Sequence, residues 1–523
     1  MTRAAWMMMP LSALVLAGCD MAPKYVRPQT PVAPAFPTGE AYAPASAEPA
    51  GLPWTALIGD TRLKTVIERA LANNRDLRVA LANVQSARAQ YKVERAAQLP
   101  TITGDATASF SRQNDNRQNS YSADVGFSAF EIDLFGRVKN LTRSALESYL
   151  ATQEGMRSTR ITLIAETANA YATMAADQEL LALSRQTLAS AERSLKLTQT
   201  LNTSGLAGKL DVHQAETTVE QARSDIEANV TQVAQDRNAL ELLVGAPVED
   251  ALLPQSLDSL LQSTAKVPAG LSSDVLLQRP DVLQAEHQLK AANADIGAAR
   301  AAMFPKISLT TAIGVASSAL SSLFSDGGFA WSAAPSASMP IFGGSARGNL
   351  DYSKAQRDLY VAQYEKAIQT AFQEVSDGLA RAGTIDRQQA AQQALVTANQ
   401  RYYALADQRY RAGIDTFLNS LTSQRSLYSA QQSAIATQLA AVQNRILLYR
   451  VIGADQYAPT RPLLPLFHAR ESCYSARIKK KERAMAFLAR CLDWLCGICA
   501  SAAQDECVIN QLISSVTRPR HTP

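Results

Sequence analysis

The sequence is poor in the residues from which catalytic, metal and disulfide-linked sites are built. It has 4 histidines and 6 cysteines in 523 residues. The histidines, at 213, 287, 468 and 521, form no His-x-x-x-His or His-Glu pair, so no zinc site is predicted. The stretch from Gly205 to Leu210 lacks the glycine spacing and the hydroxyl residue of a phosphate-binding loop. We therefore expect no catalytic residue, no metal ligand and no enzyme activity.

Long apolar runs and a concentrated basic surface are also missing. No run of eighteen apolar residues occurs, so we expect no inner-membrane helix in the mature chain. Most of the chain is close to neutral, which argues against nucleic-acid binding. From Asn140 to Leu201 there is no proline and only one glycine, Gly155. Such a stretch favours one helix of about 90 Å, longer than an ordinary domain is wide.

The N-terminus has the pattern of a lipoprotein signal. An apolar run follows Arg3 and ends in Leu16-Ala17-Gly18-Cys19, so residues 1–18 are predicted to be removed and Cys19 to carry a covalent lipid. The alternative is an ordinary secretory signal with an incidental cysteine. Asp20 resembles the residue that retains lipoproteins at the inner membrane of enteric bacteria. Frequent prolines between 23 and 53 predict that residues 19–60 form an extended tether.

Four segments show the alternation of strands, in two hairpins. They are Ile102 to Phe110 with Ser120 to Gly136, and Lys306 to Val315 with Phe329 to Phe342. One face of each is apolar and the other is small or polar. The apolar parity switches at Phe130, which predicts a bulge or a change of environment.

These strands fit either a soluble β-sandwich or the wall of an outer-membrane barrel. The smallest membrane barrel needs roughly eight strands, and four cannot close a ring without leaving unpaired edges in lipid. If the strands span a bilayer, the chain must therefore oligomerise. Periodicity alone leaves two, three or four copies open.

The helical regions repeat along the chain. An apolar stripe at 77, 81, 84 and 91 is repeated between 282 and 296, and Arg95 to Pro100 is similar to Arg300 to Pro305. Gly205 and Gly413 mark corresponding turns between long helices. We predict a first repeat at 61–245, a linker at 246–270 and a second repeat at 271–453.

The sequence resembles a known family. Matching segments are YVRP from Tyr25, NRDL from Asn74, EIDLFGR from Glu131, VPAGL from Val267, RPD from Arg279, AANADIGAAR from Ala291 and YEKAIQTAFQEV from Tyr364. They resemble the TolC-like outer-membrane efflux proteins, in the lipoprotein branch that includes OprM and NodT. The resemblance covers about 19 to 453.

The resemblance implies a mostly α fold with a small β part. Three chains would form a 12-stranded outer-membrane barrel, four strands from each, continued by a long periplasmic α-helical barrel. The implied function is the exit duct of a tripartite pump that exports drugs or other small toxic compounds from a Gram-negative cell. The implied partners are a periplasmic adaptor and an inner-membrane transporter of the resistance-nodulation-division type. No cofactor is expected except the lipid on Cys19. Alternatives are a duct for type I protein secretion and a non-conducting coiled-coil scaffold lipoprotein.

The resemblance also implies a periplasmic gate beside the second turn. Tyr410 and Arg411 match residues that bond neighbouring helices in the closed state, and Leu418 matches a constricting apolar ring. Where the family commonly has an aspartate this chain has Thr422, which predicts weaker cation selectivity and block unless Asp415 substitutes. Each of these residues has an alternative interpretation as a solvated residue of a helix turn.

The end of the chain does not resemble the family. Residues 454–523 are predicted to be a non-family tail, disordered or produced by a shifted or read-through frame. Five of the six cysteines crowd there, at 473, 491, 496, 499 and 507. The single Cys-x-x-Cys pair at 496 and 499 is weak evidence for a metal or redox site.

Overall fold

The computed structural model describes residues 20–42, 53–113, 116–266, 272–324, 328–342 and 344–453. All of them belong to one compact unit, Met1–Tyr457. Cys19 and the tail beyond residue 453 lie outside the described residues, so the structure does not bear on the lipid or tail predictions. None of the described helices is both long enough and apolar enough to cross a membrane.

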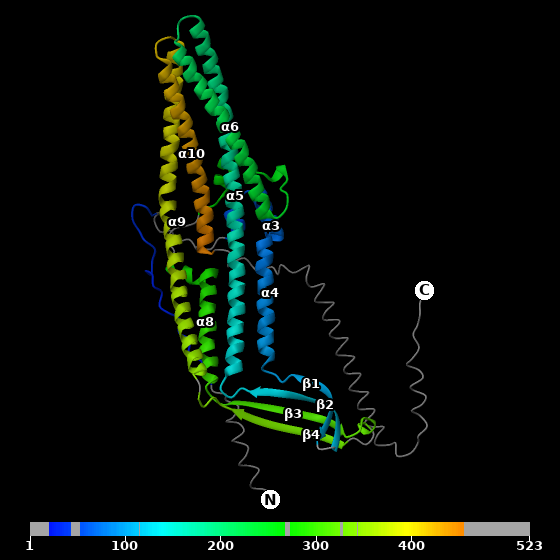
Figure 1. Cartoon of the computed structure of the whole chain (residues 1–523). Helices are drawn as coiled ribbons and strands as arrows, with labels where there is room; N and C mark the ends of the chain where they lie inside the picture. The colour runs from blue at the N-terminus through cyan, green and yellow to red at the C-terminus, as the bar shows by residue number, and fades with distance from the viewer. Residues whose placement is uncertain are drawn as a thin grey trace, which may run out of the picture. The chain divides into compact units, whose positions relative to one another are not determined.

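The predicted hairpins are confirmed, and they join into one antiparallel sheet in the order β1-β2-β3-β4 (Figure 1). The strands are β1 (Ile102–Gln113), β2 (Asn116–Ile132), β3 (Lys306–Ser317) and β4 (Gly328–Ser338). Strand β2 pairs with β3, so the two hairpins meet although they lie far apart in sequence. Strands β2 and β4 end earlier than the alternation predicted, because the chain turns at 133–136 and Pro340 follows β4 closely.

The parity switch in β2 is a real irregularity of the ladder. The register of β2 against β3 shifts between Phe127 and Phe130. Within this shift Ala129 has a φ of 52°, the one positive φ of a non-glycine residue in the described chain. The extra residue turns the following side chains over, so that Phe130 and Ile132 rejoin the apolar face. Because of the bulge, the apolar residues before and after it lie on the same face of the sheet.

Long helices form the rest of the first half. Helices α3 (Thr61–Asn73) and α4 (Arg75–Ala96) precede the sheet, and α5 (Arg137–Thr203) and α6 (Lys209–Val244) follow it. Asn74 accepts a hydrogen bond from the Leu77 N–H and so caps α4. Helix α5 has 67 residues, about 100 Å of helix. Gly245 ends α6 in the left-handed conformation with a φ of 71°.

The second half repeats these elements with α8 (Pro280–Ala301), α9 (Ser345–Arg411) and α10 (Phe417–Ile452). Helices α5 and α9 both have 67 residues, and α6 and α10 both have 36. The start of α5 at Arg137 corresponds to the start of α9 at Ser345, a shift of 208 positions. The same fold has thus been built twice.

Short elements complete the fold. They are α2 (Trp54–Leu57), η1 (Asp250–Leu252), α7 (Leu257–Ser263), η2 (Ser273–Gln278) and η3 (Leu320–Ser322). Helix α7 lies in a segment whose residue pattern predicted only a loop. Its Leu257, Leu260 and Leu261 are buried in the largest apolar cluster, where α7 packs against α5 and α10.

Of the predicted tether 19–60, residues 20–42 pack along the helices. Residues 53–60 differ from the prediction, because they include helix α2, and Trp54, Leu57 and Ile58 are buried in the largest apolar cluster. Phe36 is buried and stacks on Phe372 of α9 with ring centroids 5.1 Å apart. Arg27 makes two hydrogen bonds to Glu286 of α8, at 3.1 and 2.7 Å. A Cβ added to Gly297 would lie 2.7 Å from the Ala22 side chain, so glycine is needed where the tether crosses α8. The tether is therefore held at several points.

Replacing Glu286 by glutamine is expected to loosen the tether. Its side chain is only 3% exposed and also pairs with Lys290 at 3.1 Å. Burial raises the pKa of Glu286, but the hydrogen bonds and charges of Arg27 and Lys290 lower it overall. The neutral variant loses charge-assisted bonds worth about 1–3 kcal/mol, and limited proteolysis should cut the tether faster. In the wild type the same contact should weaken as the pH falls below about 4.5, when the carboxylate takes up a proton.

Glu249→Gln is the matched control for this prediction. Glu249 forms an ion pair with Arg69 that is largely open to solvent, and such pairs contribute about 0–1 kcal/mol. Equal proteolysis of the two variants would contradict the proposed importance of Glu286.

Candidate functional site

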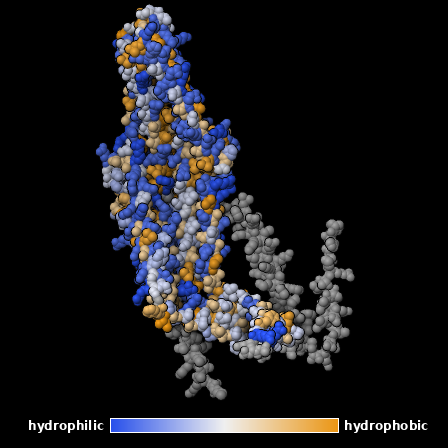
Figure 2. Space-filling model, viewed as in Figure 1, coloured by the Kyte–Doolittle hydropathy of each residue, from blue (hydrophilic) through white to orange (hydrophobic). Residues whose placement is uncertain are grey.

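The sheet exposes a continuous apolar face. Directly paired residues share a face, and one row across the sheet consists of Gly104, Val125, Ile313 and Trp331. Val125, Ile313 and Trp331 are 53%, 54% and 71% exposed. In Figure 2 pale to orange colouring predominates over the sheet, whereas blue predominates over the helices. An apolar face of this size is unfavourable in water and needs an apolar environment or a partner.

The opposite face carries small and polar residues. One row contains Asp105, Asp124, Gly314 and Ala330, and the next pairs Thr107 with Ser122, whose hydroxyl oxygens lie 2.6 Å apart. A Cβ at Gly314 would collide with the Ala123 carbonyl oxygen. This close backbone approach requires glycine. The two faces therefore differ in the way expected of a wall with lipid on one side and water on the other.

Both outer strands of the sheet have a single neighbour. Strand β1 pairs only with β2, and β4 pairs only with β3, among the described strands. Strand β1 contributes twelve residues to its ladder with β2, so its other edge presents a long row of backbone groups. An edge of this length must be paired if it is placed in lipid.

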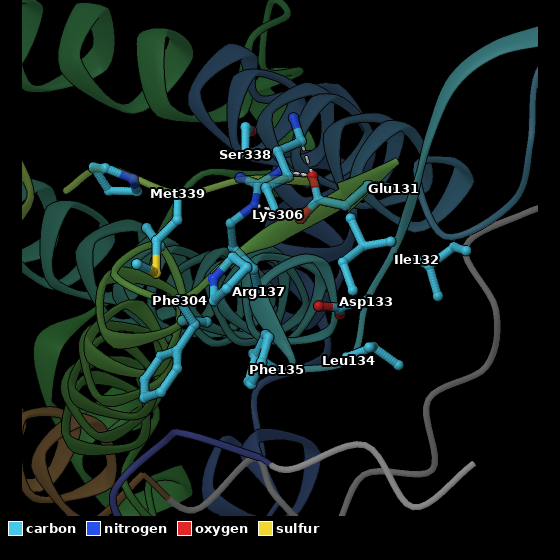
Figure 3. A pocket seen from close by; sticks show the side chains of 15 residues that line it. Glu131, Ile132, Asp133, Leu134, Phe135, Arg137, Phe304, Lys306, Ser338 and Met339 are labelled. Atoms are coloured by element: carbon cyan, nitrogen blue, oxygen red, sulfur yellow. Dashed lines mark hydrogen bonds and ion pairs between the residues drawn. The ribbon is translucent and has the colours of Figure 1, made fainter. Parts of the chain in front are cut away.

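A charged cluster fixes the junction between the sheet and α5 (Figure 3). Arg137 donates two hydrogen bonds to Glu131, at 2.8 and 2.6 Å, and Lys306 of β3 lies 3.2 Å from the same carboxylate. Gly136 precedes α5 with a φ of 75°, a conformation that favours glycine. The segment EIDLFGR thus supplies the last residues of a strand, a turn and the first residue of a helix.

The same junction lines a pocket of about 520 Å³ that is partly open to solvent. Phe135 and Phe304 stack at its side with ring centroids 4.8 Å apart, and Met339 lies near them (Figure 3). The carboxylate of Glu131 is already paired with two cations, Arg137 and Lys306. In the described ranges no three His, Cys, Asp or Glu side chains are placed to hold a metal ion. The junction is best explained as a structural connection.

The predicted gate residues gather around the turn between α9 and α10. Tyr410 is buried, and its hydroxyl lies 3.1 Å from the Thr198 hydroxyl of α5. Its ring also packs on Phe417 at a centroid distance of 5.3 Å. Burial is the main cause that raises the pKa of Tyr410, so the hydroxyl stays protonated. Tyr410 therefore links the second turn to the first half of the chain.

The other gate candidates are more exposed. Arg411 pairs with Asp407 of its own helix at 2.8 Å. Leu418 is 55% exposed, and Thr422 is exposed one helical turn further along α10. In the described chain the ion pair of Arg411 stays within its own helix, and neither Leu418 nor Thr422 is buried. Their predicted role at a gate depends on neighbouring copies and stays a prediction.

Asp415 is held by its own chain. It accepts hydrogen bonds from the Thr416 N–H at 2.8 Å and the Asn419 side chain at 2.6 Å, and Arg409 lies 3.3 Å away. These hydrogen bonds lower the pKa of the Asp415 carboxyl. The carboxylate therefore stays ionised, but it is committed to stabilising the turn, which makes it a poor substitute for an aspartate at 422.

One buried ionic cluster was not assigned a role by the residue pattern. Arg279 donates to Asp281 at 2.6 Å, to Glu374 of α9 at 2.8 Å and to the Val451 carbonyl of α10 at 2.8 Å. Its side chain is 8% exposed. The signal that could have found it is the segment RPD, where an arginine precedes a helix-starting proline and an aspartate.

Tyr410→Phe is expected to loosen the second turn. The variant keeps the ring and loses one buried hydrogen bond, worth about 0.5–1.5 kcal/mol. Hydrogen exchange at residues 405–420 should therefore become faster by about 2- to 10-fold. Tyr402→Phe is the control, because that side chain is 49% exposed on the same helix. Unchanged exchange in Tyr410→Phe would contradict the link to Thr198.

The chain is similar to known proteins over most of its length. A family profile described as outer membrane efflux protein matches residues 66–246 and 271–454. The toluene efflux pump outer membrane protein TtgC of Pseudomonas putida is 46% identical over 463 residues, covering 86% of this chain and 95% of that protein. Outer membrane protein OprJ of Pseudomonas aeruginosa is 40% identical over 452 residues, covering 85% of this chain and 94% of that protein.

Solved structures agree with the sequence comparison. The open state of the Neisseria gonorrhoeae MtrE outer membrane channel has a TM-score of 0.76 and 36% identity, covering 84% of this chain and 98% of that chain. The TolC-like fold implied by the segments from Tyr25 to Val375 is thereby confirmed. The chain belongs to the outer membrane efflux protein family.

Proposed function

We propose that this chain is the outer-membrane channel of a tripartite efflux pump. Three copies form a barrel of twelve strands in the outer membrane, and their helices continue it into the periplasm. The channel receives its cargo from a periplasmic adaptor and an inner-membrane transporter of the resistance-nodulation-division type. The transporter supplies the energy, so the channel itself needs no catalytic group.

The observation that carries the proposal is the open four-stranded sheet with one apolar face. Four strands are too few to close a membrane barrel, and both β1 and β4 keep an edge without a partner within the described chain. Copies of the same chain supply the missing strands, because β4 of one copy can pair with β1 of the next. Three copies give the twelve strands implied by the family resemblance.

The cargo proposed is small apolar or amphipathic compounds, including solvents and antibiotics. The support comes from the Pseudomonas putida relative, which is named for toluene efflux. The chain matches that protein over 95% of its length. Protein secretion, which the sequence left as an alternative, has no comparable support.

We also propose that a lipid on Cys19 anchors the chain. Asp20 accepts hydrogen bonds from the Asn140 side chain and the Ala22 N–H, both at 3.0 Å, and lies 3.4 Å from Lys139. Asn140 and Lys139 belong to the first turn of α5, which directly follows the sheet. The lipid would therefore emerge beside the strands. These contacts give Asp20 a structural role distinct from sorting.

Opposite faces of β4 give a direct test of the channel. Trp331→Lys places a charge on the apolar face, where lipid would make it cost about 2–4 kcal/mol near the midplane. Ser332→Lys places the same charge on the polar face, where water is expected. In cells lacking the native gene, Ser332→Lys should restore low dye accumulation and a detergent-extracted trimer, and Trp331→Lys should restore much less of both.

Other outcomes would contradict the proposal. A non-conducting scaffold predicts that the delipidated protein stays soluble without detergent and that dye accumulation is unchanged by its loss. A sheet whose two faces are both in water predicts that the two lysine variants behave alike. Intact mass of the mature wild type should equal residues 19 onward plus the lipid, and a mass without lipid would contradict the anchor.

Thr422→Asp is expected to increase cation selectivity. Threefold symmetry would bring three carboxylates together at the constriction, where they would attract cations. Planar-bilayer recordings should then show stronger selectivity for cations and stronger block by multivalent cations. Asp415→Asn is the comparison variant and should change selectivity less, because Asp415 is occupied by Asn419 and Arg409. Unchanged selectivity in Thr422→Asp would contradict the position of the gate.

A further inference from the structure

Two aspartates face each other across the seam between α5 and α6. Asp177 lies on α5, and Asp236 lies opposite it on α6 within hydrogen-bonding reach. Asp236 is 8% exposed, so its carboxyl group is largely removed from water. Asp177 is half-buried. Two carboxylates within hydrogen-bonding reach in such surroundings repel each other strongly unless one of them binds a proton.

The second half of the chain shows that this seam does not require the pair. The shift of 208 positions that relates α5 to α9 and α6 to α10 brings Asp177 onto Ile385 and Asp236 onto Asn444. Ile385 and Asn444 are each 5% exposed and Asp236 is 8% exposed, whereas Asp177 is half-buried. One half of the molecule thus packs the seam with a neutral pair and the other with two acids.

Among the described residues, no cation contributes to the shift at Asp177. The causes acting on Asp177 are its burial, the hydrogen bond with Asp236 and the charge of Asp236. Gln232 donates to the Asp236 Oδ1 atom at 2.9 Å. The Oδ2 atom is buried and accepts no hydrogen bond from the rest of the described residues. A proton on Asp177 would supply the hydrogen-bond donor that the Asp236 Oδ2 atom lacks.

Charged groups on the surrounding elements are engaged elsewhere. Glu179 of α5 accepts a hydrogen bond from the Leu257 N–H, and Arg237 of α6 pairs with Glu241 and Asp250. Arg62 of α3 donates to Gln255, and Arg445 of α10 donates to the carbonyls of Leu261 and Thr264. The protonation of the pair is therefore decided mainly by the two acids themselves.

We propose that Asp177 and Asp236 form a proton-binding site that holds α5 against α6. The pair binds one proton, which the two carboxyl groups share as a hydrogen bond across the seam. When the proton leaves, two negative charges face each other in the partly buried seam. Their repulsion then loosens the contact between α5 and α6. The site lies outside the strands, and it does not depend on the proposed transport function.

The pH range of the effect follows from the carboxyl group. Burial, followed by the hydrogen bond and the charge of Asp236, raises the pKa of Asp177 from 3.8 to about 7. Between about pH 4 and pH 7 the folded chain therefore keeps a proton that the unfolded chain has released. Stability conferred by the site is complete below about pH 4 and is lost as the pH rises through about 7.

Asp177→Asn and Asp236→Asn test the site in the full-length protein in detergent. Each asparagine can donate a hydrogen bond to the remaining carboxylate without needing the shared proton. The melting temperature of the wild type should fall more steeply between pH 5 and pH 8 than that of either variant. Between pH 5 and pH 7 the unfolding equilibrium constant of the wild type should change more than that of the variants, by a factor of at most about 100. Hydrogen exchange, corrected for its intrinsic pH dependence, should place the difference at residues 172–181 and 232–241.

Glu220→Gln is the control, because Glu220 is exposed on α6 and pairs with Arg223. It should keep the wild-type dependence on pH. Equal pH dependence in the wild type and both asparagine variants would overturn the proposal. If one variant does not fold, the other decides the question. Recovery of the wild-type melting temperature at pH 8 by millimolar Ca²⁺, absent in Asp177→Asn, would also overturn it, because the pair would then hold a metal ion and not a proton.

Discussion

Backbone hydrogen bonding at the two edges of the sheet is the constraint on which the rest of the structure depends. A strand in lipid has no water to satisfy its free N–H and C=O groups. The four strands of one chain satisfy each other internally but end in β1 and β4. Everything else about the assembly follows from pairing these edges, since the long helices must then be arranged around the same axis as the strands.

The four strands and the long helices of one chain come from a duplicated unit. Each half contributes one hairpin and one pair of helices of 67 and 36 residues. Equal helix lengths keep the two turns, at Gly205 and Gly413, level with each other along the bundle. The two halves nevertheless differ in some contacts. The Tyr410 hydroxyl of the second half is hydrogen-bonded to the Thr198 hydroxyl of the first, and Asp177 of the acidic seam corresponds to the neutral Ile385.

Much of the fold was predictable because strands and long helices produce patterns among residues that are close together in sequence. Alternation identified all four strands. The change of parity at Phe130 predicted either a bulge or a change of environment, and the structure has a bulge at this point. Helix α7 was missed because seven residues are too few to show a helical period. The junction of Glu131 with Lys306 and the lock of Arg27 on Glu286 could not be predicted, because they join residues far apart in sequence. Gate residues could be named only through the family resemblance, because their environment requires other copies.

The attachment of the tether has a mechanical consequence. Along residues 20–42 the chain is fastened first by Asp20 to Asn140, then by Arg27 to Glu286, and later by the Glu40 carbonyl to Arg387 of α9. A force applied at the N-terminus is therefore transmitted to α5 and α8 before it can reach α9. All three attachment points lie on helices, so a pull on the N-terminal end of the tether would load α5 and α8 directly and the strands only through them.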